Sequence, residues 1–399
     1  MTVVMASSVG RRWGPGSAAA VAVAVAAATV LCAIAVLGSP FTCMLTARGT
    51  QQSVALRPAR PPLQPQLAGL GNSSRPAALP CAFNTLLNNG DVQWSERNGT
   101  AHRLSIRGCK LHRYTHEQAK QCLAGKRLVF VGDSITRYQY LSLTYFLEKG
   151  KWPAPLGGVP GDPSVTNEHE WPSWNDFLKG TSALFGGREL CDCYRAHYIL
   201  GVTPKPPESE KFENRFYTSK DGKTSVSHFT YTTEPQTVHG HAGFPPYING
   251  QKPCLPANCT TPADWQFRLA PALRKVVGAL QPTHVVLNSG LWGSSNAFGD
   301  DAWRAIAAAG LESVSQQQGR VIWRTTTANR GPRGPTRDHD ASALQFTAAE
   351  GWAVLDAYTI TRPLMQMQNQ PLWDARHFQA VVYQELNLYL LNMICEPQL

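Results

Sequence analysis

The sequence contains little charge, and that charge is unevenly distributed. Charged residues make up 16% of the 399 residues, and the first 80 residues contain no Asp or Glu. Six arginines in that stretch account for six of the ten net positive charges, which leaves +4 and no run of Lys and Arg for the remaining chain. Because nucleic-acid binding usually requires a concentrated basic face, this distribution argues against a nucleic-acid partner.

The cysteines lack the C-x-x-C spacing that is typical of zinc sites. Cys32 and Cys43 lie near the N-terminus, and the remaining eight could form disulfides of undetermined connectivity: Cys81, Cys109, Cys122, Cys191, Cys193, Cys254, Cys259 and Cys395. His239-Gly-His241 has no evident third ligand, so we expect an exposed loop pair there. The sequence therefore predicts disulfides, an oxidising compartment and no resident metal. Three N-x-S/T sequons, at Asn72, Asn98 and Asn258, fit a glycosylated luminal surface.

An uncharged apolar run covers residues 17–37 and is long enough to cross a bilayer as a helix. Arg11 and Arg12 precede it, which favours a cytosolic N-terminus and a single-pass type II orientation. A cleaved signal peptide is the alternative. We expect a cytosolic tail at 1–16, a signal anchor at 17–37, a Pro-rich luminal stem at 38–80 and a folded domain at 81–399.

The folded part alternates between short apolar runs and helical patterns. The runs predict strands at 127–131, 194–200, 226–231, 283–287, 320–325 and 352–358, and the helical patterns cover 135–149, 265–280, 301–318 and 378–395. Residues 81–125 show little periodicity and read as a lead-in held by disulfides. Strands separated by helices predict an α/β fold with a central parallel sheet, right-handed crossovers and helices on both faces.

The stretch LVFVGDSITRYQYLSL places Ser134 between the end of the first strand of this pattern and the start of a helix. Backbone N–H groups at a helix start favour negative charge, and ligands of open α/β sheets bind at this edge. A plain turn capped by Asp133 or Ser134 is the alternative. The position suits a nucleophilic hydroxyl.

Far downstream, WDARHF supplies Asp374 and His377, three residues apart. A serine nucleophile needs a base to take its proton, and that base needs an acid to orient it. Asn288 follows the predicted strand 283–287, where its amide could donate to an oxyanion together with the Ser134 N–H. Alternatively, Asp374 caps the last helix and Asn288 caps a loop. The joint pattern predicts a Ser134, His377 and Asp374 triad.

These motifs, in this order, resemble the SGNH (GDSL-like) esterase fold. LAGKRLVFVGDSITRYQYLSL and VVLNSGLW look more closely like its PC-esterase branch, which includes the plant trichome-birefringence-like polysaccharide O-acetyltransferases and the animal neurexophilin-like and sialate O-acetyltransferase catalytic domains. The similarity spans roughly residues 81–395. It implies a three-layer α/β/α domain, the triad above, and an oxyanion role for Asn288. It also implies that Arg137 faces the same site and has an oxyanion role, although a surface or ion-pair arginine is an equal alternative.

The chain departs from the plant enzymes at two places. They usually carry Asn-Gln after the arginine of the first motif, whereas this chain carries Tyr138-Gln139. Their D-x-x-H is typically followed by Trp-Cys-Leu-Pro-Gly, whereas Phe378-Gln-Ala follows His377. The resemblance therefore does not carry over a plant-type xylan or pectin acceptor.

The resemblance, the anchor and the stem imply a Golgi-membrane O-acetyltransferase that moves an acetyl group onto glycan or polysaccharide hydroxyls through an acyl-serine. A carbohydrate acetyl-esterase using the same triad is the alternative, and a non-catalytic glycan-binding module is less favoured. No bound cofactor is expected. The acetyl donor is a co-substrate, and because acetyl-CoA is cytosolic, a separate multi-span transporter is an expected partner. Four tryptophans could stack on sugars or pack beneath loops: Trp152, Trp171, Trp174 and Trp292.

Overall fold

The computed structural model describes residues 79–80, 86–88, 90–97, 100–153, 174–194, 212–231, 237–240, 265–291, 300–316, 320–330, 337–372 and 374–395. All of them belong to one unit, Ser73–Leu399. Within these ranges no helix is long and apolar enough to span a bilayer. The predicted tail and anchor, and the stem except for residues 79–80, lie outside the described residues.

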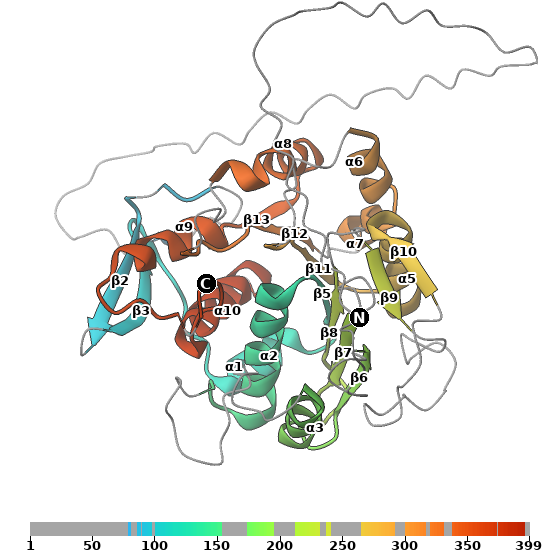
Figure 1. Cartoon of the computed structure of the whole chain (residues 1–399), viewed down its shortest axis with the longest axis horizontal. Helices are drawn as coiled ribbons and strands as arrows, with labels where there is room; N and C mark the ends of the chain where they lie inside the picture. Colours follow the sequence, from blue (N-terminus) through green and yellow to red (C-terminus); the bar gives the residue numbers. More distant parts are fainter. Residues whose placement is uncertain are drawn as a thin grey trace, which may run out of the picture. The chain divides into compact units, whose positions relative to one another are not determined.

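A seven-stranded sheet forms the centre of the domain, with the strand order β13-β12-β11-β5-β8-β7-β6 (Figure 1). In that order the strands are Ala353–Leu355, Arg320–Arg324, His284–Leu287, Arg127–Gly132, Ser225–Thr230, Phe212–Thr218 and Glu189–Tyr194. The first five are parallel, and β7 runs antiparallel to β8 and β6. The predicted α/β class and mostly parallel sheet are confirmed, whereas the antiparallel edge was not predicted.

Strand β5 is the central strand of the seven-stranded sheet and lies between β11 and β8, parallel to both. Alternate side chains point to opposite faces: Leu128 and Phe130 enter one apolar core, and Val129 and Val131 enter the other. A strand covered on both faces needs apolar side chains on both, which explains the unbroken run that predicted it.

Helices cover both faces of the sheet (Figure 1). One core contains side chains of α1 (His116–Leu123), α2 (Ser134–Lys149), α3 (Trp174–Leu184), α9 (Ala357–Thr361) and α10 (Ala380–Ile394). The other contains side chains of α5 (Leu269–Leu280), α6 (Asp300–Ala307), α7 (Leu311–Gln316) and α8 (Ala341–Glu350). Two 3-10 turns, η4 (Arg337–Asp340) and η5 (Arg362–Gln366), complete this part of the chain. The arrangement is compatible with a three-layer α/β/α fold.

Two predicted helices are interrupted. The pattern at 265–280 begins as strand β10 (Trp265–Arg268), which pairs antiparallel with β9 (Thr237–Gly240), before α5 starts. The pattern at 301–318 is divided into α6 and α7 by Gly310, whose φ of 91° does not fit a right-handed helix. Likewise β13 is shorter than predicted, because Asp356 caps α9 by accepting from the Thr359 N–H.

The lead-in contains a small second sheet of strands β1 (Leu79–Pro80), β2 (Val92–Arg97), β3 (Thr100–Ile106) and β4 (Cys109–Lys110). It is attached to α10 by the buried carboxylate of Glu385, which accepts from the Leu104 N–H at 3.1 Å and from Arg113 at 2.5 Å. The lead-in, for which the sequence indicated no regular elements, is therefore a folded attachment to the last helix.

Disulfides join Cys122 to Cys395 and Cys191 to Cys193, with Cα–Cα distances of 5.7 and 5.4 Å. Cys109 is also disulfide-bonded. The Cys122 bridge ties the end of α1 to the end of α10 across 273 residues of chain.

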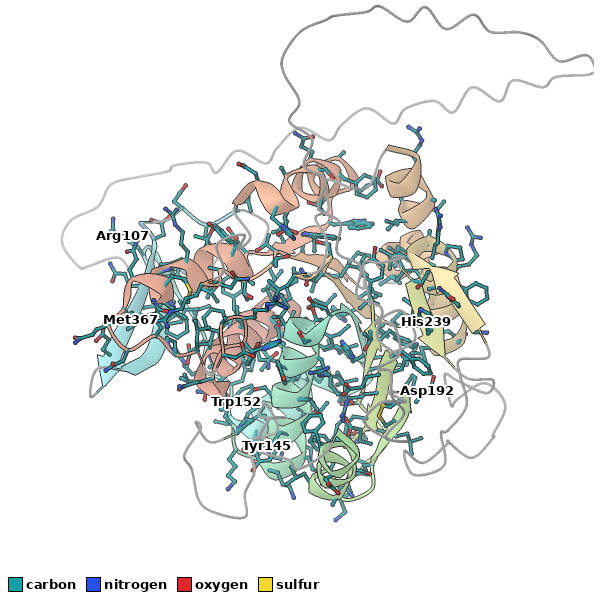
Figure 2. The ribbon with its side chains drawn as sticks, viewed as in Figure 1. Arg107, Tyr145, Trp152, Asp192, His239 and Met367 are labelled. Atoms are coloured by element: carbon teal, nitrogen blue, oxygen red, sulfur yellow. A yellow bond between two sulfur atoms is a disulfide. The ribbon has the colours of Figure 1, made fainter. Side chains whose placement is uncertain are left out.

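Helix α2 packs against the parallel strands β5 and β8. Its residues 135–147 are all buried, because α10 packs beside it (Figure 1). It ends at Gly150, which takes the left-handed conformation (φ 73°) that is common for a glycine after a helix. Near this end, Trp152 stacks on Phe146 at 3.9 Å between ring centroids, and Figure 2 labels it just above Tyr145. Of the two alternatives for Trp152, sugar stacking or packing, the structure shows packing.

Candidate active site

The turn between β5 and α2 presents Ser134 at the carboxyl edge of the sheet. Strand β5 ends at Gly132, Asp133 is the N-cap, and Ser134 is the first residue of α2. A Cβ at Gly132 would lie 2.4 Å from the Thr136 hydroxyl, so only glycine allows this close passage. The first N–H groups of a helix need acceptors outside the regular pattern, and here the Ile135 N–H donates to the Asp133 carboxylate at 3.1 Å and the Thr136 N–H to the Asp133 carbonyl at 3.1 Å.

Ser134, His377 and Asp374 form a hydrogen-bonded chain. The Ser134 Oγ lies 2.7 Å from His377 Nε2, although 243 residues separate the two. The His377 Nδ1 lies 2.6 Å from Asp374 Oδ2. An ionised carboxylate only accepts hydrogen bonds, so Nδ1 carries the hydrogen and Nε2 is left to accept the serine proton. The structure thus brings the three predicted triad residues together in the predicted order.

The Asp374 carboxylate is held by its own turn. Its Oδ1 accepts from the backbone N–H groups of Arg376 at 2.6 Å and His377 at 2.7 Å. Partial burial raises the pKa of Asp374, but the hydrogen bond and charge of His377 and these two N–H groups outweigh it and hold the pKa well below the usual range. The N-cap of α10 is Gln379, so the alternative that Asp374 caps this helix is wrong.

The segment that carries the acid and the base is anchored on both sides. Phe378 is fully buried and bridges to Leu372, and the Gln379 N–H donates to the Pro371 carbonyl at 2.8 Å. The side chains of His377 and Asp374 remain 12% and 31% exposed. The base is therefore fixed in place yet accessible from solvent.

Asn288 lies beside this turn, at the end of β11, but its amide is already engaged. Its Nδ2 donates to the Arg324 carbonyl at 2.8 Å and to the Thr326 hydroxyl at 3.2 Å, and its Oδ1 accepts from the Thr136 hydroxyl at 3.3 Å. In this state Asn288 ties β11, β12 and α2 together. Donation to an oxyanion requires one of these bonds to be exchanged, so that role stays a prediction.

Asp133 has a structural task that the sequence did not reveal. Besides accepting from the Ile135 N–H at 3.1 Å, it accepts from the Leu291 N–H at 2.6 Å and so fixes the loop after β11 against the Ser134 turn. A Cβ at Gly290 would lie 2.4 Å from the Asp133 carboxylate, and the φ of Gly290 is 75°. The glycine of the Asn-Ser-Gly motif was the available signal for this close contact.

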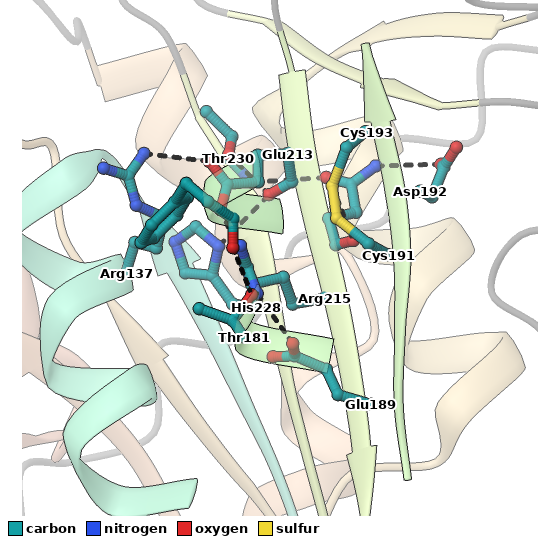
Figure 3. Close-up of a disulfide and its surroundings, with 12 residues drawn as sticks. Arg137, Thr181, Glu189, Cys191, Asp192, Cys193, Glu213, Arg215, His228 and Thr230 are labelled. Carbon is teal, nitrogen blue, oxygen red and sulfur yellow. Dashed lines mark hydrogen bonds and ion pairs between the residues drawn. A yellow bond between two sulfur atoms is a disulfide. The ribbon is translucent and has the colours of Figure 1, made fainter. Parts of the chain in front are cut away.

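Arg137 forms a buried ion pair with Glu213 at 3.0 Å. Glu213 also binds Arg215 at 2.5 Å, and Arg215 binds Glu189 at 2.7 Å, which gives a charge-balanced cluster behind α2 beside the Cys191–Cys193 disulfide (Figure 3). Thus the geometry matches the ion-pair alternative for Arg137, and its oxyanion role stays a prediction.

The structure corrects the expectation for His239. It lies buried in β9 and not in an exposed loop, and its Nε2 is 2.7 Å from the Thr237 hydroxyl. His241, Trp171 and Trp292 lie outside the described residues. No group of three or more potential metal ligands occurs in the part of the chain that the structure describes.

A groove of about 780 Å³ lies at the opposite, amino edge of the parallel strands and is lined by Gly125, Arg127, Lys223 and Gln281, among others. Ligands of open α/β sheets bind at the carboxyl edge. The groove also holds no paired acid and base, so we place the candidate site at Ser134. In comparisons with known proteins, no family model and no curated protein sequence matches the chain.

Proposed function

We propose that this protein is a serine-dependent acyltransferase of the SGNH type, which moves an acetyl group onto a glycan or polysaccharide hydroxyl. The observation that carries the proposal is the Ser134–His377–Asp374 hydrogen-bond chain at the carboxyl edge of a parallel sheet. The sequence resemblance to the PC-esterase branch supports the same chemistry.

In the first half-reaction, Ser134 Oγ attacks the acyl carbonyl carbon while its proton passes to His377 Nε2. Asp374, kept ionised by its low pKa, stabilises the imidazolium that forms. The tetrahedral intermediate then collapses, the donor's alkoxide leaves with the proton from His377, and an acyl-Ser134 remains. In the second half-reaction an acceptor hydroxyl gives its proton to His377 Nε2 and attacks the ester carbonyl carbon. The bond between that carbon and Ser134 Oγ breaks, and Oγ takes the proton back from His377.

Negative charge on the intermediate needs donors at the start of α2. The Ser134 N–H belongs to the first turn of that helix, where the helix dipole also favours an anion. Asn288 joins them if its amide turns from the Arg324 carbonyl toward the oxyanion.

Hydrolysis is the second candidate, and the exposure of the base favours it. Because His377 and Asp374 are 12% and 31% exposed, water can reach the acyl-serine unless the acceptor excludes it. The predicted signal anchor, stem and sequons favour the first candidate, since they suit a Golgi-membrane protein that meets glycans. That location requires a luminal acetyl donor or a multi-span transporter as partner.

The test uses the full-length chain expressed in a secretory host, with a chromogenic acetyl ester and a panel of oligosaccharides. We expect acetylated oligosaccharide, and a loss of about 10³-fold or more in Ser134→Ala. Ser142→Ala is the matched control, because Ser142 is buried on the same helix and its hydroxyl has no hydrogen-bond partner among the described residues.

Acetate released without acetylated glycan would favour the hydrolase. Full activity in Ser134→Ala, or an equal loss in Ser142→Ala, would contradict the proposed nucleophile.

A further inference from the structure

Tyr138 lies directly against the base of the proposed triad. It is fully buried on α2, one helical turn after Ser134, so both side chains share a face of the helix. Its ring centroid is 4.9 Å from that of His377, and the two rings are nearly perpendicular at 85°. Edge-to-face contacts of this kind favour one relative orientation of two rings.

Tyr138 is itself held from two sides. The Arg137 guanidinium lies over its ring, 4.8 Å from the centroid, and the Tyr383 ring of α10 lies 5.8 Å away. Arg137 is fixed in turn by its buried ion pair with Glu213 (Figure 3). A rigid aromatic ring, not an adaptable side chain, therefore faces His377.

Two hydrogen bonds hold His377 before the reaction, one between Nδ1 and Asp374 and one between Nε2 and the Ser134 hydroxyl. The edge-to-face contact with Tyr138 is a third contact, and it opposes rotation about the terminal torsion of the histidine side chain, which is broad. Once Ser134 is acylated, its hydroxyl proton is gone, and Asp374 and Tyr138 remain to hold the imidazole.

We propose that Tyr138 is a positioning residue for His377, which keeps Nε2 directed at the reacting oxygen and matters most when the acyl-serine is resolved. The inference rests on the proposed function. It concerns a position where this chain differs from the plant enzymes that it resembles, which usually carry asparagine there. An asparagine side chain has no ring with which to make the edge-to-face contact.

The experiment compares three variants of the full-length chain. Tyr138→Phe keeps the ring, Tyr138→Leu keeps a buried apolar side chain without it, and Tyr145→Leu makes the same loss elsewhere on α2. Tyr145 is buried and lies 11 residues beyond Ser134, about 16 Å along the helix. We expect kcat to fall about tenfold in Tyr138→Leu, acyl-Ser134 to accumulate by intact mass, and the other two variants to stay within about twofold of wild type.

A second measurement does not depend on turnover. In Tyr138→Leu, the Nδ1 proton of His377, observed by NMR with labelled histidine, is expected to exchange with solvent about tenfold faster than in wild type or Tyr145→Leu. Equal exchange and equal kcat in Tyr138→Leu and Tyr145→Leu would overturn the positioning role. If wild type forms no acyl-Ser134, the proposed function fails, and the proton exchange still decides whether Tyr138 holds His377.

Discussion

Helix α2 carries two tyrosines that contact two histidines in contrasting surroundings. Tyr138 meets His377 at 4.9 Å between ring centroids, and Tyr140 meets His228 at 5.9 Å. His377 is 12% exposed, and both of its ring nitrogens are hydrogen-bonded. His228 is fully buried on β8, and its Nε2 has no hydrogen-bond partner among the described residues.

The difference shows how histidine can serve two purposes, as a proton acceptor and as a buried neutral side chain, against opposite faces of helix α2. Burial, together with the nearby arginines, lowers the pKa of His228 to about 3, although the Glu213 charge acts in the other direction. His228 is therefore neutral and takes up no proton near neutral pH. His377 has a carboxylate on one nitrogen and a hydroxyl on the other, which is what proton transfer requires.

The carboxylates of the two regions also differ. Asp374 is partly exposed, and its pKa is lowered by His377 and by backbone N–H groups despite partial burial. Glu189 is fully enclosed, and its pKa is raised, because the loss of solvent outweighs the charge of Arg215. We therefore expect changes near Asp374 to affect the reaction, and changes in the cluster around Glu189 to affect stability.

The largest difference between the effects on kcat and on Tm is expected from an Asp→Asn substitution made in each region. Asp374→Asn keeps the shape of the side chain but removes the charge that fixes the tautomer of His377, so kcat should fall by on the order of 10⁴-fold with little change in Tm. Asp192→Asn alters a buried carboxylate that accepts from the Asn214 amide at 3.1 Å. It should lower Tm and leave kcat of the folded protein unchanged.

Both quantities come from one preparation of each variant, by initial rates and by thermal unfolding. A Asp374→Asn variant that retains its rate would remove the reason to distinguish the two regions. A rate loss in Asp192→Asn at unchanged Tm would show that this antiparallel edge of the sheet takes part in the reaction.

A smaller but still large effect is expected from the centre of the cluster. Arg215→Met removes the cation that pairs with Glu213 and Glu189 and leaves two buried carboxylates without it. The free energy of unfolding should fall by about 3–5 kcal/mol, measured by denaturant titration. Arg188→Met is the control, because the Arg188 and Glu148 pair is partly exposed at the arginine and should matter by only about 1 kcal/mol. Equal losses in both variants would mean that burial does not decide the outcome.

The two regions also differ in how much of each could be predicted from the sequence. The triad and the Ser134 turn follow from local patterns: an apolar strand, a Gly-Asp-Ser turn and an acid three residues before a histidine. The cluster does not, because Glu213, Arg215 and Glu189 meet only when β7 pairs with β6 in a register set by the folded sheet. Strand β7 itself was missed, since its charged residues hide a strand that is buried throughout its first six residues. Asp133 was visible as a cap but not as the acceptor for Leu291, a contact made across 158 residues.

The smallest expected effect is the pH dependence that His228 contributes to stability. Its pKa is about 3 in the fold, where burial is the main cause, against an ordinary value of 6.5 in the unfolded chain. Between these values the unfolded chain binds a proton that the folded protein does not, so this contribution to stability is complete above pH 6.5 and is lost as the pH falls. From pH 7 to pH 5 the loss is about 2 kcal/mol.

His228→Gln removes the titrating group, so its free energy of unfolding should fall less steeply with acid than that of wild type. The difference in slope against pH should correspond to the uptake of about one proton on unfolding. His284→Gln is the matched control. Burial, together with nearby cations, also lowers the pKa of His284, to about 4. His284 lies on β11, outside the cluster of Arg137, Glu213, Arg215 and Glu189. The two slope changes should add, because no hydrogen bond joins His228 to His284 among the described residues and each proton binds independently. An unchanged slope in His228→Gln would mean that His228 is already protonated in the fold, and the contrast with His377 would then lose its physical basis.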